Sequence, residues 1–167
     1  MKKKALVVID IQNDITKNYK EIIDNINCAI DWAAKNGIHV VYIRHENLSA
    51  GTRTFKPDTR GAELAPDLDI ISENIFTKYK GNALSSEAFA DFINSNGICN
   101  FYIAGADAAA CVKSTCFNLR KAKYDVTVLS DCITSYDKRK IDEMLLYYES
   151  KGCKIISLDA LLSSVNA

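Results

Sequence analysis

Short apolar runs alternate with amphipathic segments along most of this chain, and this alternation constrains the fold more than any other feature of the sequence. We expect strands at residues 4–11, 38–43, 75–78, 101–104, 126–129 and 154–157. We expect helices at residues 19–35, 85–94 and 138–151, another from residue 111 and a short one from residue 158. Because such alternation requires right-handed crossovers, it predicts an α/β fold: a doubly wound, mostly parallel sheet of about six strands with helices on both faces.

The chain has 167 residues, which is enough for a full core, and we expect a single domain over residues 1–167. Its 21 basic and 21 acidic side chains balance, so its net charge favours neither nucleic acid nor an anionic membrane as a partner. We expect no membrane span and no signal peptide, because the apolar runs are too short. Six cysteines without a CxxC pair indicate reduced thiols, and we therefore expect a cytoplasmic protein.

Cys111 lies where the expected strand 101–104 gives way to a helix, after Gly105 and a run of small residues. At such a junction, backbone N–H groups point outward and the helix dipole favours an anion. We therefore expect a lowered thiol pKa, donors for an oxyanion, and a thiol more reactive than the other five. The alternative interpretation of Cys111 is a small buried hydrophobic residue.

Three different chemical groups follow predicted strands, and the strands of a parallel sheet deliver such groups to one edge. They are the carboxylate of Asp10, the amine of Lys78 and the thiol of Cys111. Together they can act as a proton acceptor, a cation that stabilises anions, and a nucleophile. Lys80 competes with Lys78, because alternate residues of an extended segment share a face. The structural alternatives are an aspartate that caps a loop and a solvated lysine.

Several segments resemble the motifs of one enzyme family. Residues 5–15, ALVVIDIQNDI, resemble an apolar strand followed by D-x-Q-N-D-F. Residues 77–84, TKYKGNAL, resemble T-K-x-x-x-S-A-F, and residues 103–115, IAGADAAACVKST, resemble I-x-G-V-x-T-D-x-C-V-x-x-T. Residues 56–68 and 124–131 resemble its G-x-E-L-x-P-x-L loop and G-Y-x-V-x-V-x-x-D strand. On these motifs the chain is similar to the isochorismatase-like cysteine hydrolases, which include nicotinamidases, N-carbamoylsarcosine amidase, and ureidoacrylate and biuret amidohydrolases.

The resemblance implies a catalytic triad of Asp10, Lys78 and Cys111. Lys78 is preferred to Lys80 because its interval to the residues that follow fits the family motif. The resemblance also implies a cis peptide bond between Ala106 and Asp107. The oxyanion donors would then be the backbone N–H groups of Asp107 and Cys111.

The chain departs from the family motifs at positions that would shape the substrate pocket. The Thr-Asp pair is replaced by alanines at 108 and 109, and the Ser and Phe of S-A-F are replaced by Asn82 and Leu84. Asp107 introduces a charge where small or polar residues are usual. We expect Asn82, Leu84 and Asp107 to contact the substrate, and we expect the triad to function despite these changes.

The resemblance implies a metal-independent amidohydrolase that cleaves a small amide or N-carbamoyl compound through a thioester on Cys111. It implies no cofactor, and it implies a homo-oligomer. Nicotinamidases carry an Asp-x-His and two further histidines, whereas this chain has only His39 and His45, so we expect no metal. The alternatives are a vinyl-ether hydrolase of the isochorismatase type, which does not use the cysteine, and a catalytically silent member that binds a metabolite or a partner protein.

Overall fold

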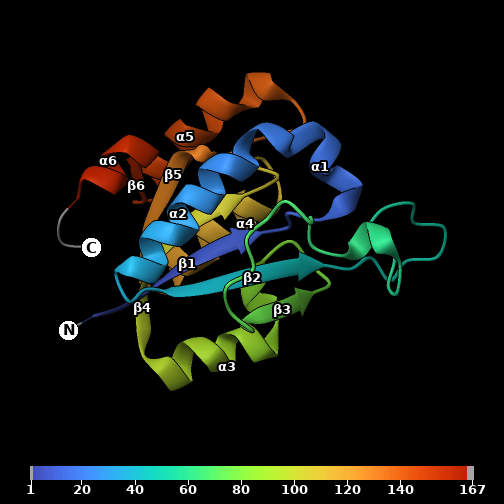
Figure 1. The fold of residues 1–167 in the computed structure, drawn as a ribbon, viewed down its shortest axis with the longest axis horizontal. Helices are drawn as coiled ribbons and strands as arrows, with labels where there is room; N and C mark the ends of the chain where they lie inside the picture. The colour runs from blue at the N-terminus through green and yellow to red at the C-terminus, as the bar shows by residue number, and fades with distance from the viewer. Residues whose placement is uncertain (1, 165–167) are drawn as a thin grey trace.

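A computed structural model describes residues 2–164, and its centre is a six-stranded, all-parallel sheet with the order β3-β2-β1-β4-β5-β6 (Figure 1). The strands are β1 (Lys3–Ile9), β2 (His39–His45), β3 (Ile75–Lys78), β4 (Ile98–Gly105), β5 (Asp125–Ile133) and β6 (Lys154–Ile156). The expected α/β fold class is therefore confirmed. The strand order reverses beside β1, because β2 pairs with one of its edges and β4 with the other. In such sheets ligands bind at this switch point, beyond the carboxyl ends of the strands.

Helices cover both faces of the sheet (Figure 1). They are α1 (Asn13–Tyr19), α2 (Ile23–Lys35), α3 (Glu87–Asn96), α4 (Cys111–Lys121), α5 (Ile141–Ser150) and α6 (Leu158–Ser163). One core cluster lies under α2 and α6, and the other lies under α3, α4 and α5. The β1 side chains alternate between these clusters, and this burial on both faces explains the unbroken apolar run of that strand. Within residues 2–164, no helix is both long and apolar enough to cross a bilayer.

The first helix begins earlier than the sequence predicts. The sequence predicts a helix only from residue 19, but α1 begins at Asn13, and the 3-10 turn η1 (Lys20–Ile22) separates it from α2. The apolar residues of α1 are Ile15 and Tyr19, which pack against the core, so this short helix has too few apolar positions for a visible stripe. The helix expected at residues 85–94 is α3, and its N-cap is Ser86, whose side chain accepts a hydrogen bond from the Phe89 N–H.

The segment between β2 and β3 contains the 3-10 turn η2 (Arg60–Ala62) and an isolated bridge from Leu64 to Gln12, and is otherwise irregular. Gln12 holds it in place. The fully buried Gln12 amide donates to the His45 and Ala62 carbonyl oxygens, at 2.8 Å each, and accepts from the His45 N–H. The loop is therefore attached to the carboxyl ends of β1 and β2.

Asp14 makes a second attachment to the same loop. Its carboxylate accepts a 2.6 Å hydrogen bond from the Phe55 N–H. A Cβ at position 61 would overlap this carboxylate, so only glycine fits there unless the carboxylate moves. Gln12 and Asp14, two polar residues of the motif at residues 5–15, therefore have a structural role, which is to hold this loop.

Candidate active site

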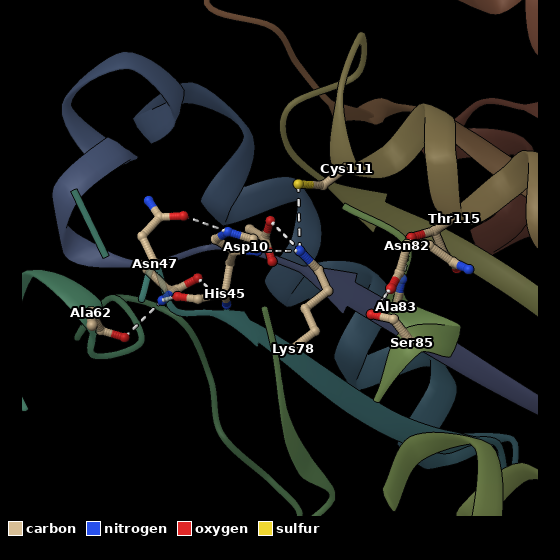
Figure 2. A network of polar contacts seen from close by, with 11 residues as sticks. Asp10, His45, Asn47, Ala62, Lys78, Asn82, Ala83, Ser85, Cys111 and Thr115 are labelled. Carbon is tan, nitrogen blue, oxygen red and sulfur yellow. Dashed lines mark hydrogen bonds and ion pairs between the residues drawn. The ribbon is translucent and has the colours of Figure 1, made fainter. Parts of the chain in front are cut away.

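The carboxyl edge of the sheet brings Asp10, Lys78 and Cys111 together (Figure 2). Asp10 directly follows β1, Lys78 ends β3, and Cys111 begins α4. The Lys78 Nζ lies 3.1 Å from Asp10 Oδ2 and 3.4 Å from Cys111 Sγ. The three side chains predicted from strand ends and motifs therefore form one contact group.

Lys80 does not join this group. The strand β3 ends at Lys78, and the chain turns before Lys80, whose side chain is exposed. The extended segment that would have placed both lysines on one face is therefore absent here. Of the two candidates, Lys78 is the one in contact with the carboxylate and the thiol.

The Lys78 ammonium is buried, and each of its three hydrogens has an acceptor. Its side chain is fully shielded from solvent. Besides Asp10 and Cys111, it contacts His45 Nδ1 at 2.9 Å. Sequence reasoning considered His45 only as a metal ligand and missed this contact. The available signal was that His45 ends β2, whose carboxyl end lies at the same edge.

Burial dominates the ionisation of the site. It raises the pKa of Asp10, against the attraction of Lys78. It also raises the pKa of Cys111 to about 12, and the nearby Asp10 charge adds to this effect while Lys78 opposes it. The expected lowering of the Cys111 pKa is therefore wrong, because desolvation outweighs the lysine and the helix N-terminus. The raised pKa favours the thiol over the thiolate, and the reactivity of Cys111 relative to the other five thiols stays a prediction.

Asp10 retains one oxygen that can receive a proton. Its Oδ2 accepts from Lys78, whereas its buried Oδ1 has no hydrogen-bond partner among the described residues. An unpaired buried carboxylate oxygen is costly, so such atoms often serve chemistry. The site thus contains a thiol that needs a base to ionise, and a carboxylate oxygen free to act as that base.

The turn between β4 and α4 shapes the backbone around the thiol. The Ala106–Asp107 peptide bond is cis, at the position that the family resemblance implied. Gly105 has a φ of 123°, and a Cβ there would overlap the backbone of Ile9 in β1, so glycine is required. The N–H groups of Ala108 and Ala110 donate to backbone carbonyls, those of Thr134 and Asp107.

The Asp107 carboxylate binds within the protein. It accepts hydrogen bonds from the Tyr19 hydroxyl, the Ser135 hydroxyl and the N–H groups of Ala109 and Tyr136, at 2.8 to 3.0 Å. Partial burial acts to raise the pKa of Asp107, but the hydrogen bonds from these donors have the larger combined effect. The pKa of Asp107 is therefore below its ordinary value. The carboxylate therefore ties α1 and the residues after β5 to the turn.

Asn82 is likewise engaged, because its Oδ1 accepts from the Leu84 N–H. Substrate contacts by Asn82, Leu84 and Asp107 stay predictions. Any contact from the Asp107 carboxylate would have to share an oxygen that already accepts hydrogen bonds within the fold.

We expect Asp107→Asn to lower the free energy of unfolding by about 2 kcal/mol at neutral pH. The amide retains one acceptor oxygen but directs an NH₂ group at donors. Because folding lowers the pKa of Asp107, its stabilisation is complete above the ordinary value of 3.8 and disappears as pH falls through the lowered pKa.

Urea unfolding of the wild type and Asp107→Asn, from neutral pH to below the lowered pKa of Asp107, measures the gap between their free energies of unfolding. This gap should close in acid. Asp125→Asn is the matched control, since the Asp125 carboxylate is exposed and pairs with Lys2 on the surface. A gap for Asp107→Asn that persists unchanged at low pH would contradict the assigned role of its charge.

Three side chains of the site are of types that bind metals. The ligand atoms of Asp10, His45 and Cys111 all lie within 4.8 Å of one another. However, the Lys78 ammonium is hydrogen-bonded to all three and is itself a cation at their centre. A metal ion fits this donor set poorly while Lys78 is charged and in place.

Comparison with known proteins gives consistent results. A family model described as the isochorismatase domain matches residues 4–160. A protein described as a probable inactive nicotinamidase, from Arabidopsis thaliana, is 28% identical over 153 residues, which cover 76% of this chain and 78% of that protein.

Solved structures share the fold. The pyrazinamidase of Pyrococcus horikoshii, solved in complex with zinc, has a TM-score of 0.83 at 23% identity, with 93% of this chain and 99% of that chain covered. The N-carbamoylsarcosine amidase of Thermoplasma acidophilum has a TM-score of 0.82 at 20% identity, with 94% and 97% covered. At these identities the likeness shows a common architecture.

Proposed function

The chain belongs to the isochorismatase family, and within this hydrolase family we propose that it cleaves a C–N bond of a small amide or N-carbamoyl compound through a thioester on Cys111. One observation carries the proposal. The Lys78 ammonium contacts both the Asp10 carboxylate and the Cys111 thiol, and Asp10 retains an unpaired oxygen. The names of the pyrazinamidase and the N-carbamoylsarcosine amidase support this class of substrate.

In the first half of the reaction, Asp10 Oδ1 takes the thiol proton as Cys111 Sγ attacks the carbonyl carbon. The tetrahedral intermediate collapses to a thioester, and the leaving amine departs with the proton that Asp10 returns. In the second half, Asp10 takes a proton from water, which attacks the thioester and releases the acid. The thiol is then protonated again, so the cycle closes without a cofactor.

The developing oxyanion needs hydrogen-bond donors, and the backbone turn can supply them. We assign this role to the N–H groups of Asp107 and Cys111. Neighbouring N–H groups, those of Ala108, Ala110 and Val112, already donate to backbone carbonyls. Cys111 is also the first residue of α4, where the helix dipole favours negative charge.

Two alternatives make different predictions. A vinyl-ether hydrolase of the isochorismatase type would not need the thiol, although Cys111 is in contact with Lys78 here. A catalytically silent protein would bind a small molecule without converting it, and the description of the plant relative as a probable inactive nicotinamidase keeps this alternative open.

Acyl-enzyme trapping distinguishes these functions. The protein is incubated with nicotinamide, pyrazinamide and N-carbamoylsarcosine in the presence of a chelator, quenched in acid and analysed by peptide mass spectrometry. We expect an acyl group on the Cys111 peptide and acid product, with neither in Cys111→Ala. Product formation by Cys111→Ala at an undiminished rate would contradict the thiol mechanism. Ligand binding without product or adduct would indicate the silent alternative.

A further inference from the structure

We infer that His45 is a positioning residue for Lys78, held by Asn47 in the one neutral tautomer that can accept a hydrogen bond from the ammonium. The inference rests on the proposed thiol chemistry and adds a chain of contacts that reaches from the loop after β2 to the nucleophile. Figure 2 shows this chain, which runs from Asn47 through His45 and Lys78 to Cys111.

The chain starts with the orientation of the Asn47 amide. Its Nδ2 donates to the Thr54 carbonyl oxygen at 2.9 Å. The backbone N–H of Asn47 also donates to the Phe55 carbonyl oxygen at 2.9 Å, which fixes the residue at both ends. Because the amide nitrogen faces Thr54, the amide oxygen faces His45.

The Asn47 oxygen decides which nitrogen of His45 carries the proton. Asn47 Oδ1 lies 2.8 Å from His45 Nε2 and can only accept, so Nε2 carries the hydrogen. In the neutral ring, Nδ1 then has a free lone pair. Lys78 Nζ lies 2.9 Å from Nδ1 and donates to it. The opposite tautomer would direct an N–H at an ammonium.

Three further groups lie against the His45 ring. Asp10 and Cys111 each have a ligand atom within 4.8 Å of one of its ring nitrogens, and Lys78 is in direct contact. The buried Phe55 ring packs against the imidazole at a centroid distance of 5.8 Å and limits its rotation.

Fixed acceptors on two of its hydrogens determine where the Lys78 ammonium points its third. Asp10 Oδ2 and His45 Nδ1 hold the nitrogen, so the remaining hydrogen is directed at Cys111 Sγ. Without the acceptor at His45, a buried charged donor lacks a partner and the ammonium is no longer centred. Stabilisation of the thiolate should then fall, although neither Asp10 nor Cys111 has changed.

His45→Asn and His45→Leu form a matched pair that tests this inference. The two replacements have nearly the same shape, and both remove the ring packing on Phe55 and the bond to Asn47. Only asparagine retains an acceptor oxygen at the position of Nδ1. The probe is iodoacetamide, with alkylation of the Cys111 peptide followed by mass spectrometry, and the exposed Cys28 on α2 is the internal reference.

We expect Cys111 alkylation to slow by about tenfold in His45→Leu and to stay within about threefold of the wild-type rate in His45→Asn. Cys28 alkylation should be equal in all three proteins. Equal slowing in both variants would show that His45 acts through packing, and no slowing in either would show that it does not position Lys78; both results overturn the inference. Failure of the proposed function has a different signature, which is turnover by Cys111→Ala.

Discussion

Replacing Lys78 with methionine is expected to reduce turnover by about a thousandfold or more, whereas Lys80→Met should stay within about twofold of the wild-type rate. The two lysines are two residues apart, but their environments differ. Lys78 is buried between the carboxylate and the thiol, and Lys80 is exposed beyond the end of β3. The measurement is kcat on whichever compound of the amide panel forms the acyl-enzyme.

The size of the Lys78→Met effect follows from the two groups that lose the cation. Burial already raises the pKa of Asp10, and without the opposing lysine the carboxyl stays protonated and cannot act as a base. The Cys111 thiolate also loses its counter-charge, so its formation becomes more costly. Circular dichroism should still report a folded protein, because a protonated Asp10 leaves no unpaired charge.

Equal losses in the two variants, or a larger loss in Lys80→Met, would contradict the assignment of the triad lysine. Retention of turnover by Lys78→Met would have the same effect. Methionine retains the length and much of the volume of the lysine stem, so a loss of turnover in Lys78→Met could not be attributed to a large cavity.

Asp10→Asn is expected to lose at least about a thousandfold in kcat, because an amide cannot take the thiol proton. It should also lower the free energy of unfolding by about 3 to 5 kcal/mol, since the buried Lys78 charge loses its partner. The double variant Asp10→Asn/Lys78→Met contains no buried charge at either position. We expect it to regain most of the lost stability and to remain inactive.

Urea unfolding and kcat of the four proteins form a double-mutant cycle. Additive losses of stability in the double variant would contradict a buried ion pair between Asp10 and Lys78. Turnover in either Asp10 variant would contradict its role as the base. In the wild type, turnover should fall as pH drops through the raised pKa of Asp10, which is above the ordinary carboxyl value of 3.8.

Much of the fold could be predicted from the sequence, because each face of the sheet leaves a periodic signal. The run before Asp10 predicts a strand buried on both faces, and β1 is such a strand. The stripe of isoleucines and alanines predicts α2. In contrast, the sequence of α1 has two apolar residues, Ile15 and Tyr19, and no periodic pattern marks it.

Only those parts of the site that follow from strand ends and sequence motifs could be predicted. They locate Asp10, Lys78 and Cys111 at one edge, but they give no side-chain directions, so the contact of His45 with Lys78 was missed. Strand ends and motifs also do not show how far a side chain is buried. The Cys111 pKa was therefore predicted in the wrong direction, since the junction of strand and helix suggests an exposed anion site and the structure has a partly buried one in which desolvation raises the pKa.

The arrangement around Lys78 has a consequence for how the reaction depends on its medium. One ammonium faces a carboxylate and a thiol, and in the proposed first step the proton crosses from Cys111 to Asp10 while the negative charge crosses the other way. The first chemical step thus shifts a dipole inside the protein and leaves the total charge of its interior unchanged. A shielded, neutral reaction centre interacts weakly with mobile ions in solution. Its rate should therefore vary little with ionic strength, unlike that of an enzyme whose catalytic charge faces the solvent.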